Sequence, residues 1–277
     1  MAVDLLQTLE EEVSPAAGLA VAIVAISTAA ILVRLTTAPK YRTEFARIGR
    51  RDLAFATLSG IALAVHFAAW FESLAWTSVA ASVTLVQAQP LFVALGAWLL
   101  LSERLSTRIV AGILVAIAGM VTMSVGDLLG GVLVGPDPML GNALALLGAV
   151  MAAGYVLAGR SLRQRVSLIP YVVVVYGVCS AVLLVIVLAQ GAPLTGYAPR
   201  EWLIFAGLAL GPGLFGHTVI NWVLAHVESS IVSVSLLAEP VGSTILALVF
   251  LGESPTLFTM LGGAVVLFGI GLTASDR

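Results

Sequence analysis

Two segments of the chain carry one pattern, QPLFVALGAWLLLSERLS at residues 89–106 and EPVGSTILALVFLGESPT at residues 239–256. In each segment a proline follows Gln or Glu, an apolar run comes next, and a glutamate begins a short polar turn. The match continues without a gap over residues 51–120 and 201–270, at an offset of 150 residues. Small and apolar residues coincide along it: Gly112 with Gly262, Gly119 with Gly269, and Leu74-Ala75 with Leu224-Ala225. This ordered set of matches indicates an internal duplication, which sets the architecture of the chain.

The composition places the chain in a lipid bilayer. Of its 277 residues, 60% are hydrophobic and 10% are charged, whereas soluble domains carry about 25% charged residues. A span needs roughly 20 apolar residues to cross about 30 Å of hydrocarbon as a helix. Nine segments fit this pattern: 15–37, 52–76, 79–101, 107–126, 139–158, 168–190, 201–226, 229–251 and 256–274. We therefore predict an all-α polytopic membrane protein.

The basic residues gather in the joints between these segments. Three clusters fall on the same side of the membrane if the chain has nine spans: Lys40, Arg42, Arg47, Arg50 and Arg51; Arg104 and Arg108; and Arg160, Arg163 and Arg165. By the positive-inside rule that side is the cytoplasm. Glu103 then lies inside and Glu253 outside, so the two copies are inverted across the membrane. Inverted repeats are the usual architecture of secondary transporters, which bind their solute near the midplane between the halves.

The duplicated motif, the glycine-rich helix that follows it and the basic joints resemble the drug/metabolite transporter superfamily, EamA-type. The resemblance covers about residues 15–275. It implies ten helices in two inverted five-helix repeats, with both termini in the cytoplasm. It also implies a cargo among amino acids, nucleotide sugars, phosphorylated sugars and drugs, without choosing one of them.

The first copy is too short to contain the family's second helix. From Arg160 to Arg200 the chain runs 40 residues and includes the span 168–190, whereas from Arg34 to Arg50 it runs 16 residues and includes none. The shortfall of 24 residues is about one membrane crossing. We therefore expect about nine helices, with the N-terminus outside. The alternative keeps helix 15–37 in the family orientation and distorts the joint at 35–50.

These arguments divide the chain into four parts. They are an acidic N-terminal tail (1–14), a first repeat that lacks one helix (15–126), an extracytoplasmic loop (127–138) and a second repeat (139–277).

Ionisable groups inside spans are costly, so each one is a candidate for function. Glu239 lies near the middle of its span, and its counterpart in the first repeat is Gln89. Pro90 and Pro240 follow these residues, and we interpret them as structural hinges because a proline weakens the helix locally. Glu239 either binds a cation, an ammonium group or a coupling proton, or is a protonated carboxyl that bonds to Ser235.

Two further polar pairs lie at similar depth in corresponding helices. His66 and Trp70 share one helix face, as do His217 and Asn221. A polar group beside an aromatic wall suits a small organic solute; the alternative is that each histidine is a satisfied structural residue. Gln87 lies on a polar stripe that either faces the cavity or joins two helices. The candidate cavity thus comprises His66, Trp70, Gln87, Gln89, His217, Asn221 and Glu239.

Glu103 and Glu253 stand at the ends of the two matching helices, each before a polar turn. Helix capping and interfacial anchoring explain them better than a role in binding solute. Tyr155 either contacts a solute or simply packs.

Other classes of function lack their sequence signatures. The chain contains no HExxH motif, no GxSxG turn, no phosphate-binding Walker loop and no paired aspartates within spans, so we expect no enzyme and no ATP-driven pump. Its single cysteine, Cys179, excludes a cysteine metal cluster. We expect no metal or other cofactor, and no nucleic-acid partner, because the basic cluster at 40–51 fits membrane topology.

We predict a secondary transporter in the cell membrane that moves a small organic metabolite, such as an amino acid, sugar derivative or drug, by alternating access. Its expected partners are the solute and the lipid bilayer, and a homodimer is left open. The alternative is a non-transporting or degenerate family member that acts as a membrane scaffold.

A cysteine at residue 2 in a Cys179→Ala background tests the topology. Nine spans with cytoplasmic basic joints put Ala2 outside the cell, because helix 15–37 must then run from outside to inside. A membrane-impermeant maleimide is therefore expected to label Ala2→Cys in intact cells. Labelling only after the membrane is opened would show instead that helix 15–37 keeps the family orientation.

Overall fold

The computed structural model of the chain describes residues 39–129, 136–191, 194–246, 248–249 and 256–275. All regular structure in these ranges is helical, and six of the helices are long and apolar enough to cross a membrane. The chain is therefore an all-α polytopic membrane protein, as its composition predicts. Of the nine predicted spans, the segment 15–37 lies outside the described residues.

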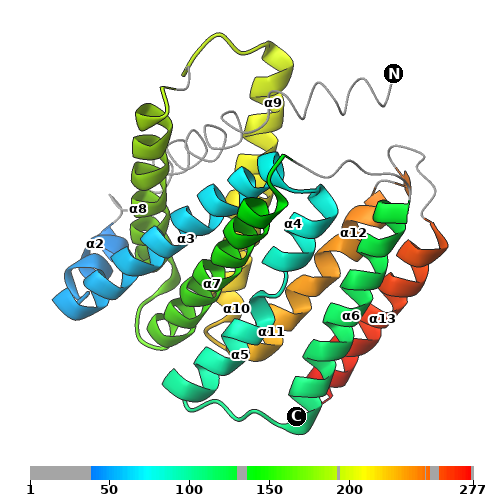
Figure 1. Cartoon of the computed structure of the whole chain (residues 1–277). Coiled ribbons are helices and arrows are strands. Elements are labelled where there is room, and N and C mark those ends of the chain that lie inside the picture. The colour runs from blue at the N-terminus through cyan, green and yellow to red at the C-terminus, as the bar shows by residue number, and fades with distance from the viewer. Residues whose placement is uncertain (1–38, 130–135, 192–193, 247, 250–255, 276–277) are drawn as a thin grey trace.

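The other eight predicted spans are helical over most of their length (Figure 1). The elements are α2 (Pro39–Ala46), α3 (Arg50–Trp76), α4 (Val79–Val86), α5 (Gln89–Leu100), α6 (Thr107–Leu129), α7 (Pro138–Arg163), α8 (Leu168–Ala189), α9 (Pro199–Leu208), the π-helix η1 (Ala209–Gly216), α10 (His217–Val223), α11 (Ser229–Ser235), the 3-10 turn η2 (Leu236–Ala238), α12 (Glu239–Leu246) and α13 (Leu257–Ala274).

Two corresponding spans are interrupted near their middle. In the first repeat α4 ends and α5 begins at Gln89, and in the second the turn η2 separates α11 from α12. Pro90 and Pro240 are each the second residue of the new helix, where the absent N–H has no intrahelical partner to lose. The local weakening predicted from these prolines is thus present as a break just before each one. Their action as hinges stays a prediction.

A third irregularity has no counterpart in the sequence analysis. The span that begins at Pro199 passes through the π-helix η1, which contains Pro212 and leads directly into His217. A proline ring clashes with the carbonyl four residues earlier in an α-helix, and a wider turn relieves that clash. Single π-helical turns are frequent at functional sites, and this one ends where α10 presents a candidate site residue.

The last helices of the two repeats, α6 and α13, pack side by side in antiparallel direction (Figure 1). A Cβ built on Gly112 would lie 2.7 Å from the carbonyl oxygen of Gly269, and one on Gly119 would lie 2.7 Å from that of Gly262. The repeat aligns Gly112 with Gly262 and Gly119 with Gly269. Gly112 therefore contacts the counterpart of Gly119, and Gly119 contacts the counterpart of Gly112. This crossed pairing places a local two-fold axis between α6 and α13, as an inverted repeat requires.

The three basic joints lie together at one end of the bundle, the lower end in Figure 1. The Arg165 Nε atom lies 2.9 Å from the Asp52 Oδ1 atom, which links the α7–α8 joint to the start of α3. The Arg160 Nε atom lies 3.0 Å from the Glu103 Oε1 atom, which links the end of α7 to the α5–α6 joint. We call this end, bounded by residues 47–52, 101–106 and 160–167, the arginine end. The positive-inside rule predicts that it faces the cytoplasm.

The joint before α3 contains the short helix α2 in its described part, residues 39–49. The Ser167 hydroxyl donates a hydrogen bond of 2.6 Å to the Glu44 Oε2 atom, so α2 lies against the α7–α8 joint. With eight residues, α2 is too short to cross the bilayer. The described joint thus has no membrane-crossing helix in the place where the family's second helix is expected.

The glycine contact between α6 and α13 predicts the effect of a single methyl group. A Cβ on Gly269 would lie 2.5 Å from the Ala116 nitrogen, whereas one on Gly271 of the same helix would meet nothing within 4 Å. Gly269→Ala is therefore expected to lower the free energy of unfolding by about 1–3 kcal/mol, and Gly271→Ala to leave it nearly unchanged. A thiol-reactive dye can follow thermal unfolding, because Cys179 is the only cysteine and is buried. Equal melting temperatures for the two variants would contradict this packing.

Candidate functional site

An aromatic and polar cluster lies where α3, α7, α8 and α10 meet, and Tyr155 on α7 is at its centre. The Asn221 Nδ2 atom donates a hydrogen bond of 2.5 Å to the Tyr155 hydroxyl. The His217 Nδ1 atom lies 3.2 Å from the same hydroxyl, and the two rings pack edge to face. Tyr155 is 2% exposed, and these two side chains are the hydrogen-bond partners of its buried hydroxyl. We call His66, Phe67, Trp70, Tyr155, His217 and Asn221 the central cluster.

The α3 side of the central cluster is a stack of aromatic rings. His66 and Trp70 stack with their centroids 5.9 Å apart, and the His66 Nδ1 atom lies 2.9 Å from the Gly148 carbonyl oxygen. The Trp70 Nε1 atom and the Asn221 Oδ1 atom are both buried without a hydrogen-bond partner among the described residues. Such orphan groups are rare in native proteins and call for an explanation. The central cluster therefore offers one unused donor and one unused acceptor.

The central cluster lies on the axis that relates the two repeats. Phe67 and His217 are counterparts at the 150-residue offset, and their rings are 5.4 Å apart at 83°. Counterparts related by a two-fold axis can touch only where they lie next to that axis. Because the same relation holds between α6 and α13, the axis passes from their crossing to the contact of Phe67 with His217.

The remaining predicted site residues lie at the two helix breaks. The Gln87 side-chain amide donates a hydrogen bond to the Glu239 carboxylate, which joins the break in one repeat to the break in the other. The Ser235 hydroxyl donates a hydrogen bond of 2.9 Å to the Ile231 carbonyl oxygen. Gln89, the counterpart of Glu239, is buried.

Gly148 on α7 lies close to both groups. A Cβ built there would lie 3.4 Å from the His66 carbonyl oxygen and from the Val86 Cγ2 atom, and 3.5 Å from the Trp70 Cβ atom. Val86 directly precedes Gln87 at the end of α4. The structure thus brings His66, Trp70, His217 and Asn221 into one cluster and joins Gln87 to Glu239 on a neighbouring segment.

Several residues of this region were not among the site candidates predicted from the sequence. Asn221 Nδ2 and the Thr218 hydroxyl each lie 3.4 Å from the Tyr176 hydroxyl on α8. Phe67 could have been found, because the repeat aligns it with His217. Tyr176 carried no such signal, since nothing in the order of residues along α8 says which helix face meets α10.

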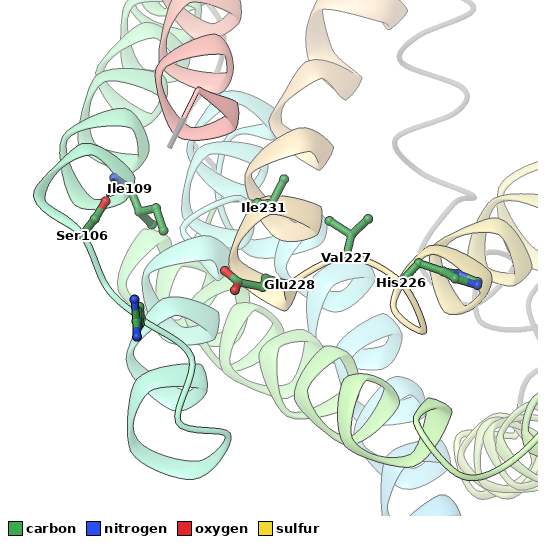
Figure 2. Close-up of a pocket in the computed structure, with 7 residues that line it drawn as sticks. Ser106, Ile109, His226, Val227, Glu228 and Ile231 are labelled. Carbon is green, nitrogen blue, oxygen red and sulfur yellow. Dashed lines mark hydrogen bonds between the residues drawn. The ribbon is translucent and has the colours of Figure 1, made fainter. Parts of the chain in front are cut away.

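The arginine end carries two hollows of the surface. One, of about 560 Å³, lies between the α5–α6 and α10–α11 joints, and its lining includes Ser106, His226 and Glu228 (Figure 2). The other, of about 620 Å³, is lined by Trp98 and by residues 102–106, among them Glu103. His226 is exposed, in agreement with the end of a helix at the membrane surface.

The helical fold, the two opposed repeats and the polar cluster between them define a multi-pass membrane transporter. The sequence profile of the EamA-like transporter family matches residues 5–125 and 139–275, so the chain belongs to that family. A protein from Archaeoglobus fulgidus, named an uncharacterized transporter, is 25% identical over 228 residues, which are 81% of this chain and 76% of that protein. A chain of known crystal structure has the same fold, with a TM-score of 0.78 and 22% identity over 99% of this chain and 91% of that chain.

Deletion of single hydroxyl groups tests the geometry of the central cluster. Tyr155→Phe removes an acceptor 2.5 Å from the Asn221 amide, whereas Tyr176→Phe removes one 3.4 Å from it. A buried group left without its partner costs about 1–3 kcal/mol, so we expect that loss in the free energy of unfolding for Tyr155→Phe. Tyr176→Phe is expected to lose less than half as much. The reverse order of melting temperatures would show that Tyr155 is not the hub of the cluster.

Proposed function

We propose that the chain is a secondary transporter that moves a small organic metabolite across the cell membrane by alternating access. The observation that carries this proposal is the position of the central cluster on the axis between two inverted repeats. A solute bound on that axis becomes accessible from either side when the halves rock against each other.

The chemistry of the central cluster suits a small organic solute. Phe67, His66 and Trp70 supply an aromatic wall, the Trp70 indole supplies an unused donor, and the Asn221 amide supplies an unused acceptor. Apolar walls with few convergent polar groups are typical of solute sites. Neither the central cluster nor the two helix breaks contain lysine or arginine. This favours a neutral or amine-bearing solute, such as an amino acid or a cationic drug, over a phosphorylated sugar.

Glu239 couples transport to a proton or balances a positive charge on the solute. Its carboxylate is held by Gln87 from the other repeat, so a change in its charge acts directly on a contact between the halves. An ionisable group inside a span is costly and is therefore a candidate for function, which supports one of these roles for Glu239.

The second candidate is a membrane scaffold that transports nothing. The observation that favours it is the eight-residue helix α2 in the place of the family's second helix. The unused polar groups of the central cluster speak against it, because a scaffold has no reason to keep them unpaired.

Reconstitution with a solute that the protein itself selects tests the proposal. The purified full-length chain is first screened for solutes among amino acids, nucleosides, sugars and organic amines that raise its melting temperature. Uptake of the best radiolabelled solute is then measured in proteoliposomes, with and without a pH gradient. Selection of solutes without any uptake above empty liposomes would support the scaffold instead.

Substitution of Glu239 distinguishes its two roles. Glu239→Gln is expected to lower gradient-driven uptake by about tenfold or more, because an amide carries no proton and balances no charge. If exchange without a gradient is kept, the role is proton coupling; if exchange is lost as well, the role is solute binding. Glu72→Gln is the matched control, because Glu72 is another carboxylate within a span and accepts a hydrogen bond from Trp76 of its own helix. Uptake by Glu239→Gln equal to that of the control would contradict both roles.

A further inference from the structure

A nearly buried carboxylate joins the two repeats at the arginine end. The Glu103 side chain, just beyond α5, is 7% exposed. It accepts hydrogen bonds from Arg160 Nε at 3.0 Å, from the Ser229 backbone N–H at 3.1 Å to each oxygen, and from the Ser229 hydroxyl at 2.9 Å. Glu103 thus caps a helix, as its sequence context predicts, but the helix is α11 of the other repeat. We call Glu103, Arg160 and Ser229 the latch.

The latch is tied to the central cluster through the last turn of α7. Arg160 also donates to the Leu224 carbonyl oxygen at 3.0 Å, and Arg163 donates to the Asn221 carbonyl oxygen at 3.0 Å. Leu224, whose carbonyl oxygen Arg160 binds, is fully buried. The end of α7 therefore holds the backbone of a central-cluster residue and the latch carboxylate at the same time.

Two surface hollows lie next to the latch on its outer side. Glu103 itself lines the hollow of about 620 Å³, and Glu228, which precedes Ser229, lines the hollow of about 560 Å³ (Figure 2). Separating a buried ion pair deep in a protein leaves uncompensated charges and is strongly unfavourable. At the arginine end, the separated carboxylate and guanidinium would enter water instead. The contact can therefore open without stranding either charge in hydrocarbon.

We propose that Glu103, Arg160 and Ser229 form the latch of a gate that closes the solute pathway at the arginine end. The inference rests on the proposed alternating access and names the contact that must break for one of its two states. Glu103 is the only one of the three that belongs to the first repeat. When residues 101–106 move away from α7 and α11, the contact is lost as a unit and the central cluster opens toward this end.

Accessibility of a buried position behind the latch measures the gate. Ser230 is 1% exposed, follows Ser229, and its hydroxyl has no hydrogen-bond partner among the described residues, so a cysteine can replace it. Ser230→Cys in a Cys179→Ala background is labelled with an impermeant maleimide in vesicles that expose the arginine end. Adding Glu103→Gln is expected to raise the labelling rate about tenfold or more. The reason is that hydrogen bonds to a charged carboxylate stabilise the closed latch more than hydrogen bonds to a neutral amide do.

Matched variants show whether charge at the latch is the cause. Glu228→Gln removes a carboxylate at the same end whose side chain makes no hydrogen bond to cap α11, and it is expected to leave the rate unchanged. Glu103→Asp keeps the charge and is expected to raise the rate less than Glu103→Gln.

Local opening is separated from unfolding by the native Cys179, which is buried in α8. In a chain that keeps Cys179, Glu103→Gln is expected to leave its labelling rate unchanged. A parallel rise at Cys179 and at Ser230→Cys would mean that Glu103 only stabilises the fold, and an unchanged rate at Ser230→Cys would mean that the latch does not gate; either result overturns the proposal. The measurement needs no solute, so an open latch in a protein that takes up nothing would refute the transport function alone.

Discussion

Backbone contact between α6 and α13 fixes how the two repeats stand to each other. Glycines at the two contact points let carbonyl groups of one helix approach the backbone of the other. Small residues of this kind let helices associate in lipid, where there is no hydrophobic driving force. Because the contact pairs each glycine with the counterpart of the other, it sets a two-fold axis. The positions of the central cluster and of both helix breaks follow from that axis.

The irregular parts of the fold lie where protein replaces lipid around the backbone. In hydrocarbon every backbone N–H and C=O must find a partner within the protein, so interruptions are tolerated only inside the bundle or along a cavity. The breaks before Gln89 and Glu239 face each other, and the π-helix η1 leads into His217 of the central cluster. The interrupted parts of the backbone thus lie next to the residues that surround the two-fold axis.

The last turn of α7 connects the middle of the bundle to its arginine end. Arg163 holds the Asn221 backbone while Arg160 holds Glu103 and Leu224. A transporter needs such a connection, since occupation of a central site must change which end is open. Here Arg160 and Arg163 make this connection. Both lie at the arginine end, and their guanidinium groups donate hydrogen bonds to the carbonyl oxygens of Leu224 and Asn221.

Much of the fold was predictable from the sequence, because lipid allows few solutions: length and hydropathy give the helices, arginine placement gives the opposed repeats, and matched motifs give the family. Depth in the span likewise indicated His66, Trp70, His217, Asn221 and Glu239 as site candidates. Only the tertiary structure showed that Tyr155 joins His217 to Asn221 and that Glu103 caps α11. These partners lie 62, 66 and 126 residues apart, and the period of a helix tells which residues share a face but not which face of another helix they meet.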